Sequence, residues 1–427
     1  GTTFALASAD DDLAPARLKL LDARTGEARA VSTIDALQAG IEDARFSPDA
    51  RQLAFAVSRA LGVEDVHVYR FEDRSVRRLT FDRLKIHNLD WSAAGDAVVF
   101  SSNRGGPFRL WQVPVAGGEP TLVPGAGDAA DDPSVAASGR IAYEVWREDA
   151  ELVSFDLGNP ATEPRMLASS TRFEWDAKVS PDGSRIAFVS DRSGAAEVWI
   201  AARNGSEPQR LTSFAGPYTH SPRWSPDGTR LAFVSPVSGR MNLFVMSPGD
   251  ASPRRVGAED IDYLAPAWAA DGASLFVGGT RVQADTRDHA IWRVPVGAGA
   301  PLRTDTAGAR TAQLSADGSQ LYYTKVGEAG LWRRSLAGAG GEERVISDLT
   351  PVDWNNWTVT PTAIFYVRRP AEAAPDLMRW DLRSGESRLV RALPGLLYKS
   401  GVWISPDERE LIATVVVRAE SDLELLE

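Results

Sequence analysis

The chain has 427 residues, and the 43% of them that are hydrophobic suffice for a large buried core. The formal net charge of −11 disfavours nucleic acid or an anionic membrane surface as the main partner. The absence of cysteine excludes disulfide bonds, thiolate metal ligands and cysteine nucleophiles. No apolar run approaches the length of a membrane helix, so we expect no membrane insertion by this chain.

Three short segments near the N-terminus, residues 4–8, 17–21 and 27–31, have the composition of β-strands. A pattern then begins that recurs to the end of the chain, most clearly as Ser180-Pro181-Asp182-Gly183. Repeats of about 45 residues filled with short strands are typical of β-propeller blades. The nine copies start at Ser47, Ser92, Ala136, Ser180, Ser225, Ala269, Ser315, Thr360 and Ser405.

The repeat that contains Ser225 predicts one four-stranded blade. Strand A covers residues 221–224, strand B 230–235, strand C 242–246 and strand D 252–256. Proline, aspartate and glycine form a tight turn between strands A and B, and this role recurs in every repeat. We therefore interpret the repeated aspartates as turn formers rather than catalytic pairs. They are Asp49, Asp182, Asp227, Asp271, Asp317 and Asp407.

The residue before each copy of the pattern is apolar, for example Trp91, Trp224 and Trp268. These side chains should pack between neighbouring blades, because aromatic residues supply much of the buried area in such cores. We therefore interpret the tryptophans as core residues rather than as a platform for stacking ligands.

The C-terminus supplies a strand A at 401–404, a strand B at 411–417 and a C-like strand at 421–427. We predict an all-β fold with one domain, residues 1–427, forming a single β-propeller of nine blades, or eight if one repeat is not a blade. Residues 1–31 and 401–427 should share the closing blade, because a joined blade removes exposed sheet edges. One C-like strand is then surplus. It could lie outside the ring, displace its rival or pair with another molecule.

Polar residues gather at the connections from strand D to strand A, which meet at one mouth of a propeller channel. This pattern predicts a ligand- or protein-binding funnel with an acidic side, and an ordinary solvated channel entrance is the alternative. The candidate residues are Glu42, Asp43, His87, Asn88, Asp131, Asp132, Trp175, Asp176, His220, Arg310, Asn355 and Lys399.

Motifs for catalysis and metal binding are missing from the sequence. His87 and His220 occupy equivalent places three repeats apart, but no local spacing resembles a metal motif. We therefore predict no catalytic residues, no metal and no cofactor, and a protein that is not an enzyme.

The runs WSPDGTRLAFVS at 224–235, NLFVM at 242–246 and PRRV at 253–256 resemble the TolB-type PD40, or WD40-like, propeller repeat. The resemblance covers nearly the whole chain, although nine repeats exceed the six of TolB. Such propellers dock envelope proteins, gate prolyl-oligopeptidase-like peptidases, or form the periplasmic sensors of membrane-anchored winged-helix regulators. The ending VVRAESDLELLE at 416–427 is most similar to the regulator type.

The resemblance implies a non-enzymatic sensor that binds an unknown ligand or protein at the channel mouth. It implies a periplasmic location in bacteria, with a membrane helix outside this sequence. This chain should not bind nucleic acid, and self-association through the surplus strand is possible. The alternatives are a TolB-type protein–protein scaffold, or the gating propeller of a peptidase whose hydrolase domain lies outside this sequence.

Overall fold

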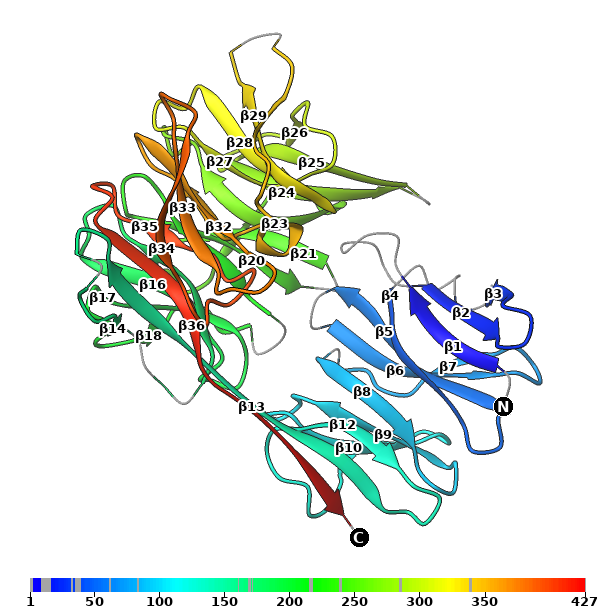
Figure 1. The fold of residues 1–427 in the computed structure, drawn as a ribbon. Coiled ribbons are helices and arrows are strands. Elements are labelled where there is room, and N and C mark those ends of the chain that lie inside the picture. Colours follow the sequence, from blue (N-terminus) through cyan, green and yellow to red (C-terminus); the bar gives the residue numbers. More distant parts are fainter. Residues whose placement is uncertain are drawn as a thin grey trace. The chain divides into compact units, whose positions relative to one another are not determined.

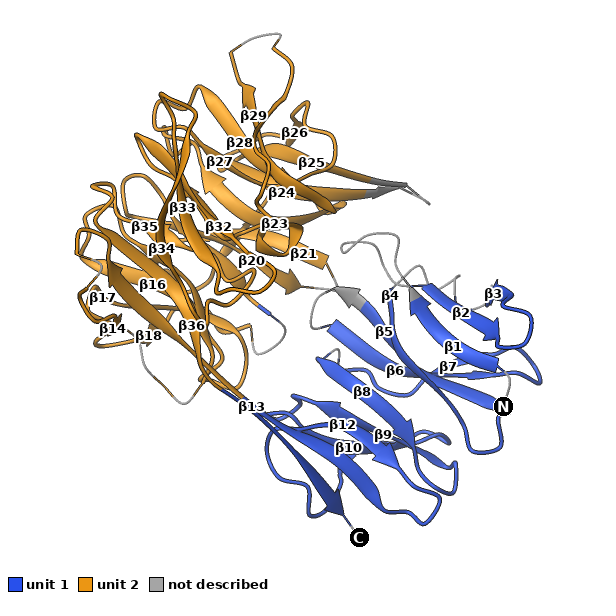
Figure 2. Ribbon diagram, viewed as in Figure 1, with its two compact units in different colours: residues 1–147, 215–218, 419–427 blue, residues 148–214, 219–418 orange. Residues whose placement is uncertain are grey.

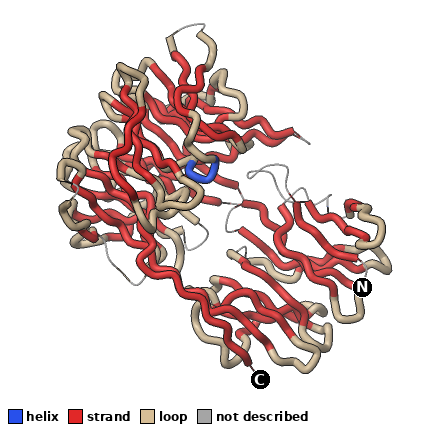
Figure 3. Tube along the Cα trace, in the orientation of Figure 1, coloured by secondary structure: helices blue, strands red, loops and turns tan. Residues whose placement is uncertain are grey.

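The computed structural model consists almost entirely of β-strands, as Figure 3 shows. Apart from the short 3-10 helix η1 (Pro351–Asp353), every described element is a strand. This confirms the all-β prediction. The structure describes residues 3–8, 17–31, 34, 40–60, 63–82, 84–159, 161–167, 170, 172–214, 218–237, 240–283, 286–337 and 340–426.

The chain divides into two compact units (Figures 1 and 2). Unit 1 comprises residues 1–147, 215–218 and 419–427, and unit 2 comprises residues 148–214 and 219–418. The two boundaries at 147 and 418 fall inside two long strands, β13 (Ile141–Asp156) and β36 (Glu410–Leu426).

Unit 1 contains antiparallel sheets built from consecutive strands. Two sheets have four strands each, and one sheet, β1–β2–β3, has three. Within each of these sheets, every strand pairs with the next strand along the chain, as is usual for strands joined by short connections. Their bounds are β1 (Thr3–Ser8), β2 (Arg17–Asp22), β3 (Ala28–Ala30), β4 (Gly40–Phe46), β5 (Gln52–Ala60), β6 (Val63–Arg70), β7 (Val76–Arg78), β8 (Ile86–Trp91), β9 (Ala97–Ser102), β10 (Arg109–Pro114) and β11 (Thr121–Leu122).

Unit 2 contains five such four-stranded sheets, each corresponding to one repeat. Their strands are β15 (Glu174–Val179), β16 (Arg185–Ser190), β17 (Glu197–Ala202) and β18 (Gln209–Arg210); β19 (His220–Trp224), β20 (Leu231–Val237), β21 (Arg240–Met246) and β22 (Arg254–Val256); β23 (Ile261–Trp268), β24 (Ser274–Gln283), β25 (Thr286–Pro295) and β26 (Leu302–Arg303); β27 (Ala309–Leu314), β28 (Gln320–Lys325), β29 (Glu328–Ser335) and β30 (Glu343–Ile346); β31 (Trp357–Val359), β32 (Ala363–Arg368), β33 (Asp376–Asp381) and β34 (Ser387–Ala392).

The remaining sheet exchanges strands between two distant repeats. It contains β12 (Ala130–Val135), β13, β14 (Arg165–Met166), β35 (Trp403–Ile404) and β36. In unit 1, β12 pairs with the first half of β13, which lies beside the end of β36, where Tyr143 Oη donates to Glu424. In unit 2, the second half of β13 lies between β14 and the start of β36, and β36 pairs with β35. The long strand β13 therefore serves as strand B in unit 1 and as strand C in unit 2. The long strand β36 serves as strand B in unit 2 and as strand C in unit 1.

A local feature of the sequence permits these two strands to run straight. Residues 146–150 and 417–421, where strand B should turn into strand C, contain neither glycine nor proline. Most other connections between strands B and C contain one or both, for example Gly105, Gly194 and Gly327. The lack of a turn residue does not by itself decide the outcome, because residues 280–288 also lack both and the hairpin of β24 and β25 forms there.

The N- and C-terminal segments therefore differ from the predicted shared blade. Strands β1, β2 and β3 form a separate sheet, whereas β35 and β36 pair in the sheet of β13. Of the two terminal C-like strands, either of which was predicted to be surplus, the N-terminal one is β2 in the sheet β1–β2–β3, and the C-terminal one is the end of β36, whose partner is β13. A single nine- or eight-bladed ring spanning residues 1–427 stays a prediction.

Hydrophobic clusters join the sheets of unit 2 in a cyclic order. Each consecutive pair of sheets shares a cluster. Val153, Phe365 and Leu411 belong to a further cluster, which joins the β31–β34 sheet to the sheet of β13, β35 and β36. Burial of these faces follows from the apolar strand-B positions of the repeat and provides the main stabilisation of the unit.

Candidate functional site

The first strand of most sheets contains a β-bulge, and the bulges position the candidate site residues. The register shifts between Glu42 and Ala44, between His87 and Leu89, and between Asp131 and Ser134. A bulge leaves one residue unpaired and redirects its neighbours. The same interruption recurs at the start of β15 and β19, so the repeat delivers polar side chains to equivalent places.

Five of the predicted residues line one pocket in unit 1. Glu42 and Asp43 come from β4, His87 and Asn88 from β8, and Asp131 from β12. Ala56 and Ile86 complete the lining of this cavity of about 230 Å³, which we call the acidic pocket. The structure thus brings together residues that are up to 89 positions apart in the sequence.

A hydrogen bond and a ring contact fix the side chain of His87 in the acidic pocket. Its Nδ1 lies 2.8 Å from Asp131 Oδ2, so Nδ1–H donates to the carboxylate, and its ring stacks on Phe108 at 4.2 Å between centroids. Burial acts to raise the pKa of Asp131, but the hydrogen bond and charge of His87, together with hydrogen bonds from the N–H of Asp132 and from Ser101, outweigh it, and the pKa is lowered. Burial, reinforced by the charge of Asp131, raises the pKa of the neighbouring Asp132.

A lysine balances part of the negative charge near the acidic pocket. Lys85 Nζ lies 3.2 Å from Glu42 and 3.0 Å from Glu64, whose side chain is fully buried. Asp43 accepts hydrogen bonds from the backbone N–H groups of Ala44 and Leu89. The guanidinium of Arg45 forms an ion pair with Asp43. The three lining carboxylates still exceed these two cationic groups, Lys85 and Arg45, so the pocket favours a positively charged ligand.

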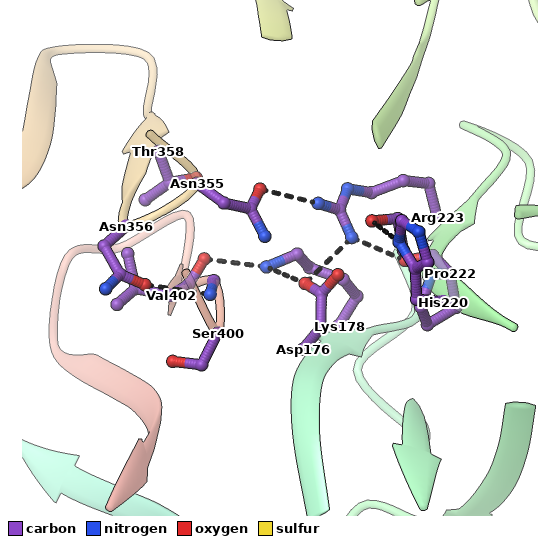
Figure 4. Close-up of polar contacts among 12 residues, drawn as sticks. Asp176, Lys178, His220, Pro222, Arg223, Asn355, Asn356, Thr358, Ser400 and Val402 are labelled. Atoms are coloured by element: carbon purple, nitrogen blue, oxygen red, sulfur yellow. Dashed lines mark hydrogen bonds and ion pairs between the residues drawn. The ribbon is translucent and has the colours of Figure 1, made fainter. Parts of the chain in front are cut away.

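Apart from Asp132, which follows Asp131 in unit 1, the other predicted residues lie in unit 2, where a buried ionic network occupies the equivalent positions (Figure 4). Asp176 is only 2% exposed, and its Oδ1 lies 3.0 Å from Arg223 and 3.3 Å from Lys178. Arg223 also donates to Asn355 at 3.3 Å, and Lys178 donates to the carbonyl of Val402 at 2.8 Å. We call these residues the unit 2 network.

The ionisation of this network follows from burial and proximity. Burial, reinforced by the charge of Arg223, lowers the pKa of Lys178 to about 8. Burial opposes the charged form of Asp176, but Arg223 and Lys178 outweigh it and lower its pKa. Burial likewise lowers the pKa of His220 to about 4, and its Nδ1 lies 2.9 Å from Ser221 Oγ.

A glycine permits the close packing of the unit 2 network. At Gly401, with φ of 78°, a Cβ atom would lie 2.5 Å from Asp176 Oδ1 and 2.9 Å from Asn355 Nδ2. Its N–H donates to Asn356, whose amide group also donates to Asp353 and to the carbonyl of Leu397. Since its charged groups bind one another, this network connects four chain segments and contributes to the integrity of unit 2.

The structure places the last three predicted residues outside both the pocket and the network core. Trp175 packs with Val189 and Ala196, which gives its ring a core role. Arg310 is buried and stacks over the Trp354 ring at 4.5 Å. Lys399 has an exposed side chain, and only its carbonyl accepts a weak bond from Asn355 at 3.4 Å.

The sequence interpretation overlooked Lys178, Arg223 and Lys85. Lys178 and Arg223 stand two positions before their Ser-Pro-Asp-Gly turns, on a strand that is otherwise apolar at its end. A charged side chain repeated at that register was the available signal. Within the described ranges, no cluster of three or more histidines or acidic residues is arranged to hold a metal ion. The described residues likewise contain no helix that is both apolar and long enough to span a membrane.

These observations define a protein with the fold of TolB-like β-propellers. Residues 196–358 match the family model of the Tricorn protease N-terminal beta propeller domain. A protein assigned as TolB from Agrobacterium tumefaciens has a similar structure, with a TM-score of 0.51 and 18% identity, covering 64% of this chain and 99% of that one.

Two further solved structures are more distant. TolB from Acinetobacter baumannii has 13% identity and a TM-score of 0.33, and the match covers 78% of this chain and 76% of that one. A puromycin-hydrolyzing peptidase from Mycobacterium tuberculosis has 16% identity and a TM-score of 0.39, and the match covers 83% of this chain but only 53% of the peptidase. The fold assignment therefore rests on the family model and the Agrobacterium structure.

Proposed function

We propose that this chain is a non-enzymatic, ligand-binding β-propeller module whose binding site is the acidic pocket of unit 1. One observation carries the proposal: Glu42, Asp43, His87, Asn88 and Asp131 reach one cavity from bulges in three different strands. Repeated bulges that present polar groups around a cavity are a common basis of binding sites on rigid scaffolds. In unit 2, we propose that the cyclic packing of six sheets forms a six-bladed ring.

The ligand of the acidic pocket should be a small organic cation. Three carboxylates line the cavity, while His87 donates its Nδ1–H to Asp131. The cavity of about 230 Å³ has room for a compact amine. Carboxylates and the Asn88 side chain can accept hydrogen bonds from an ammonium group, and charge-assisted bonds of this kind are stronger than neutral ones.

The biological setting that we propose is the extracytoplasmic sensor of a bacterial transmembrane transcriptional regulator. The ending at 416–427 resembles that class, and the fold is that of TolB-like propellers. A periplasmic location is part of this proposal. Ligand binding in unit 1 would then be the signal that the rest of the regulator detects.

Titration calorimetry with putrescine tests the binding proposal, and 1-butanol is a neutral comparison. We expect binding of putrescine that weakens by about tenfold or more in Asp131→Asn, because one charge-assisted contact contributes about 1.5 kcal/mol or more. Asp128→Asn is the matched control, since Asp128 is an exposed carboxylate of the same unit outside the pocket. Equal affinity of the wild type and Asp131→Asn for putrescine, or no binding of any small amine, would contradict the proposal.

A second candidate function is protein–protein association through the end of β36. Leu423 and Leu425 are 81% and 59% exposed on the last strand of a sheet. Strands with exposed apolar residues at a sheet edge favour pairing with another chain. Sedimentation velocity of the wild type and Leu423→Lys tests this function, and a monomer at all concentrations would exclude self-association.

A further inference from the structure

Two inter-sheet grooves of unit 2 are filled by the same arginine–tryptophan pair. Arg185 lies over the Trp224 ring at 4.7 Å and donates to the carbonyl of Gly228. Arg230 lies over the Trp268 ring at 5.0 Å and donates to the carbonyl of Gly272. In both grooves the arginine comes from the preceding sheet, five residues after its turn serine. The tryptophan comes from the following sheet, one residue before its turn.

The groove between the sheet of β35 and β36 and the sheet of β15 and β16 has a different arrangement from these two grooves. Glu410 occupies the repeat position of the arginine, and Val179 occupies that of the tryptophan. The pair is instead inverted, because Trp403 comes from the preceding sheet and Arg203 from the following one. Arg203 lies over the Trp403 ring at 5.4 Å and forms an ion pair with Glu410.

The groove with the inverted arginine–tryptophan pair contains a cavity. A cavity of about 480 Å³ is lined by Val179, Pro181, Gly183, Trp403 and Pro406, among other residues. In the next groove the corresponding contact is closed, since a Cβ at Gly228 would lie 3.4 Å from Pro181. A Cβ at Gly183 would have no neighbouring atom within 4 Å. We call this cavity the inverted groove.

Two acidic and two basic residues line the inverted groove, and the acidic residue Asp407 accepts through Oδ1 from Ser405 and from the N–H of Arg409. Glu410 uses Oε1 to accept from Ser154 and Oε2 to accept from Arg203 Nη2. Nη1 of Arg203 is buried and has no hydrogen-bonding partner among the described residues. Arg409, which also lines the cavity, is exposed. An unsatisfied buried guanidinium N–H is destabilising, and an anionic acceptor would offset this cost.

We propose that the inverted groove binds a small organic carboxylate with an apolar body. The carboxylate would accept from Nη1 of Arg203, with Arg409 at the rim. The apolar body would contact the Trp403 ring and the prolines Pro181 and Pro406, which form the walls. The chemistry differs from that of the acidic pocket, so the two sites select ligands of opposite charge. The proposal is independent of the ligand proposed for unit 1.

Titration calorimetry of the full chain with N-acetyl-L-phenylalanine tests this site, and N-acetyl-L-phenylalaninamide is the neutral comparison. We expect the acid to bind about tenfold or more tightly than the amide, because only the acid forms a charge-assisted bond with Arg203. Arg203→Gln should remove this preference. Arg185→Gln is the matched control, because it removes the equivalent guanidinium from a filled groove.

A second variant keeps the test decisive if Arg203→Gln fails to fold. Val179→Trp places an indole at the position that Trp224 occupies in the next groove, so it should fill the cavity and abolish binding while the circular dichroism spectrum is retained. Equal affinity for the acid and the amide would overturn the proposal. So would undetectable binding of the acid to the wild type, or wild-type affinity in folded Arg203→Gln or Val179→Trp.

Discussion

Several residues at one repeat position have an unusual backbone conformation. Asp43, Asp132, Asp176 and Ser221 each stand four residues before their turns and have φ values of 44°, 43°, 51° and 58°. Non-glycine residues rarely adopt positive φ, and aspartate tolerates it better than most because its side chain can bond locally. The bulge therefore selects for aspartate or glycine, and Gly401 occupies this position in the last repeat. Because aspartate tolerates this strained conformation, the same backbone position places several carboxylates at the candidate sites.

Asp176 should be essential for the stability of unit 2. Asp176→Asn keeps a residue that tolerates positive φ but leaves Lys178 and Arg223 buried without a counter-charge. We expect it to lower the free energy of unfolding of the unit by about 3 kcal/mol, measured by urea denaturation. The double variant Asp176→Asn/Lys178→Met should recover part of this loss. An unchanged urea midpoint for Asp176→Asn would show that the ion pairs contribute little.

The stability of unit 2 should depend on pH through His220. Burial lowers the pKa of its imidazole to about 4 in the folded state, whereas an unfolded histidine titrates near 6.5. As the pH falls, the unfolded state therefore binds the proton first. The stabilisation is complete above about pH 6.5 and is lost progressively down to about pH 4, by up to about 3 kcal/mol.

Urea unfolding of the wild type and His220→Gln from pH 4 to pH 8 measures this effect. Asp176 and Arg223 are the charged groups that act on His220, and both variants retain them. The difference in unfolding free energy between the two proteins should change across that window. A difference that is constant with pH would disprove a buried, neutral His220.

At the scale of the element, the turn between strands A and B has one construction in five of the repeats. In the turn of β19 and β20, Ser225 Oγ donates to Asp227 at 2.5 Å, and the N–H of Thr229 donates to the same carboxylate at 3.0 Å. The same bonds recur at Asp49, Asp182, Asp317 and Asp407. The prediction that these aspartates form turns is confirmed.

The turns should lose strength in acid. The bond from Ser225 and the bonds from Thr229 lower the pKa of Asp227 to about 2, and Asp182 and Asp317 behave alike. A lowered folded-state pKa means that the stabilisation is present above about pH 4 and is lost as the pH falls toward 2. Asp227→Ala should lower the melting temperature at pH 7 and have little effect near pH 2. An equal decrease at both pH values would contradict this role.

The long strands β13 and β36 connect two repeats that are far apart in sequence. Truncation after Arg418 removes the part of β36 that belongs to unit 1 but retains its pairing with β35 in unit 2. Hydrogen exchange measured by mass spectrometry should therefore show lost protection in β13 near Tyr143 and unchanged protection in β16 and β20. Lost protection throughout unit 2 would show that the end of β36 is needed there as well.

At the scale of the whole molecule, unit 2 has the features of an independent domain. Its six sheets pack in a cyclic order, and the last cluster joins Leu411 to Phe365 and Val153. Residues 148–418 contain both β35 and the portions of β13 and β36 that complete the cycle. A cyclic arrangement buries apolar surface on both faces of each sheet and leaves only short, protected sheet edges.

A fragment of residues 148–418 should fold without unit 1. We expect a monomer with a β-type circular dichroism spectrum, cooperative thermal unfolding and dispersed amide resonances. The fragment of residues 1–147 is the comparison, because it lacks the end of β36 and should be less stable. Aggregation of the 148–418 fragment, with rescue by added residues 1–147, would argue for one domain across the whole chain.

The sequence by itself determined the strands, their turns and the grouping of four strands into a sheet. These features depend on alternating apolar residues and on turn residues within about 45 positions, as the repeats at Ser180 and Ser225 illustrate. It also predicted the polar positions that line the acidic pocket, because one bulge recurs at one register. Trp175 shows the limit of that rule, since a periodic position does not reveal whether a large ring turns toward the core.

Only the tertiary structure decided which distant segments pair. Strands B and C of the repeats at Ala136 and Ser405 exchange partners, although both sequences are compatible with an ordinary blade. That choice depends on the free edges that remain once other sheets have formed, which is a non-local property of the fold. The inverted groove arises in the same way, because Arg203 and Trp403 are two hundred residues apart and meet only where the last strands pack on β15 and β16.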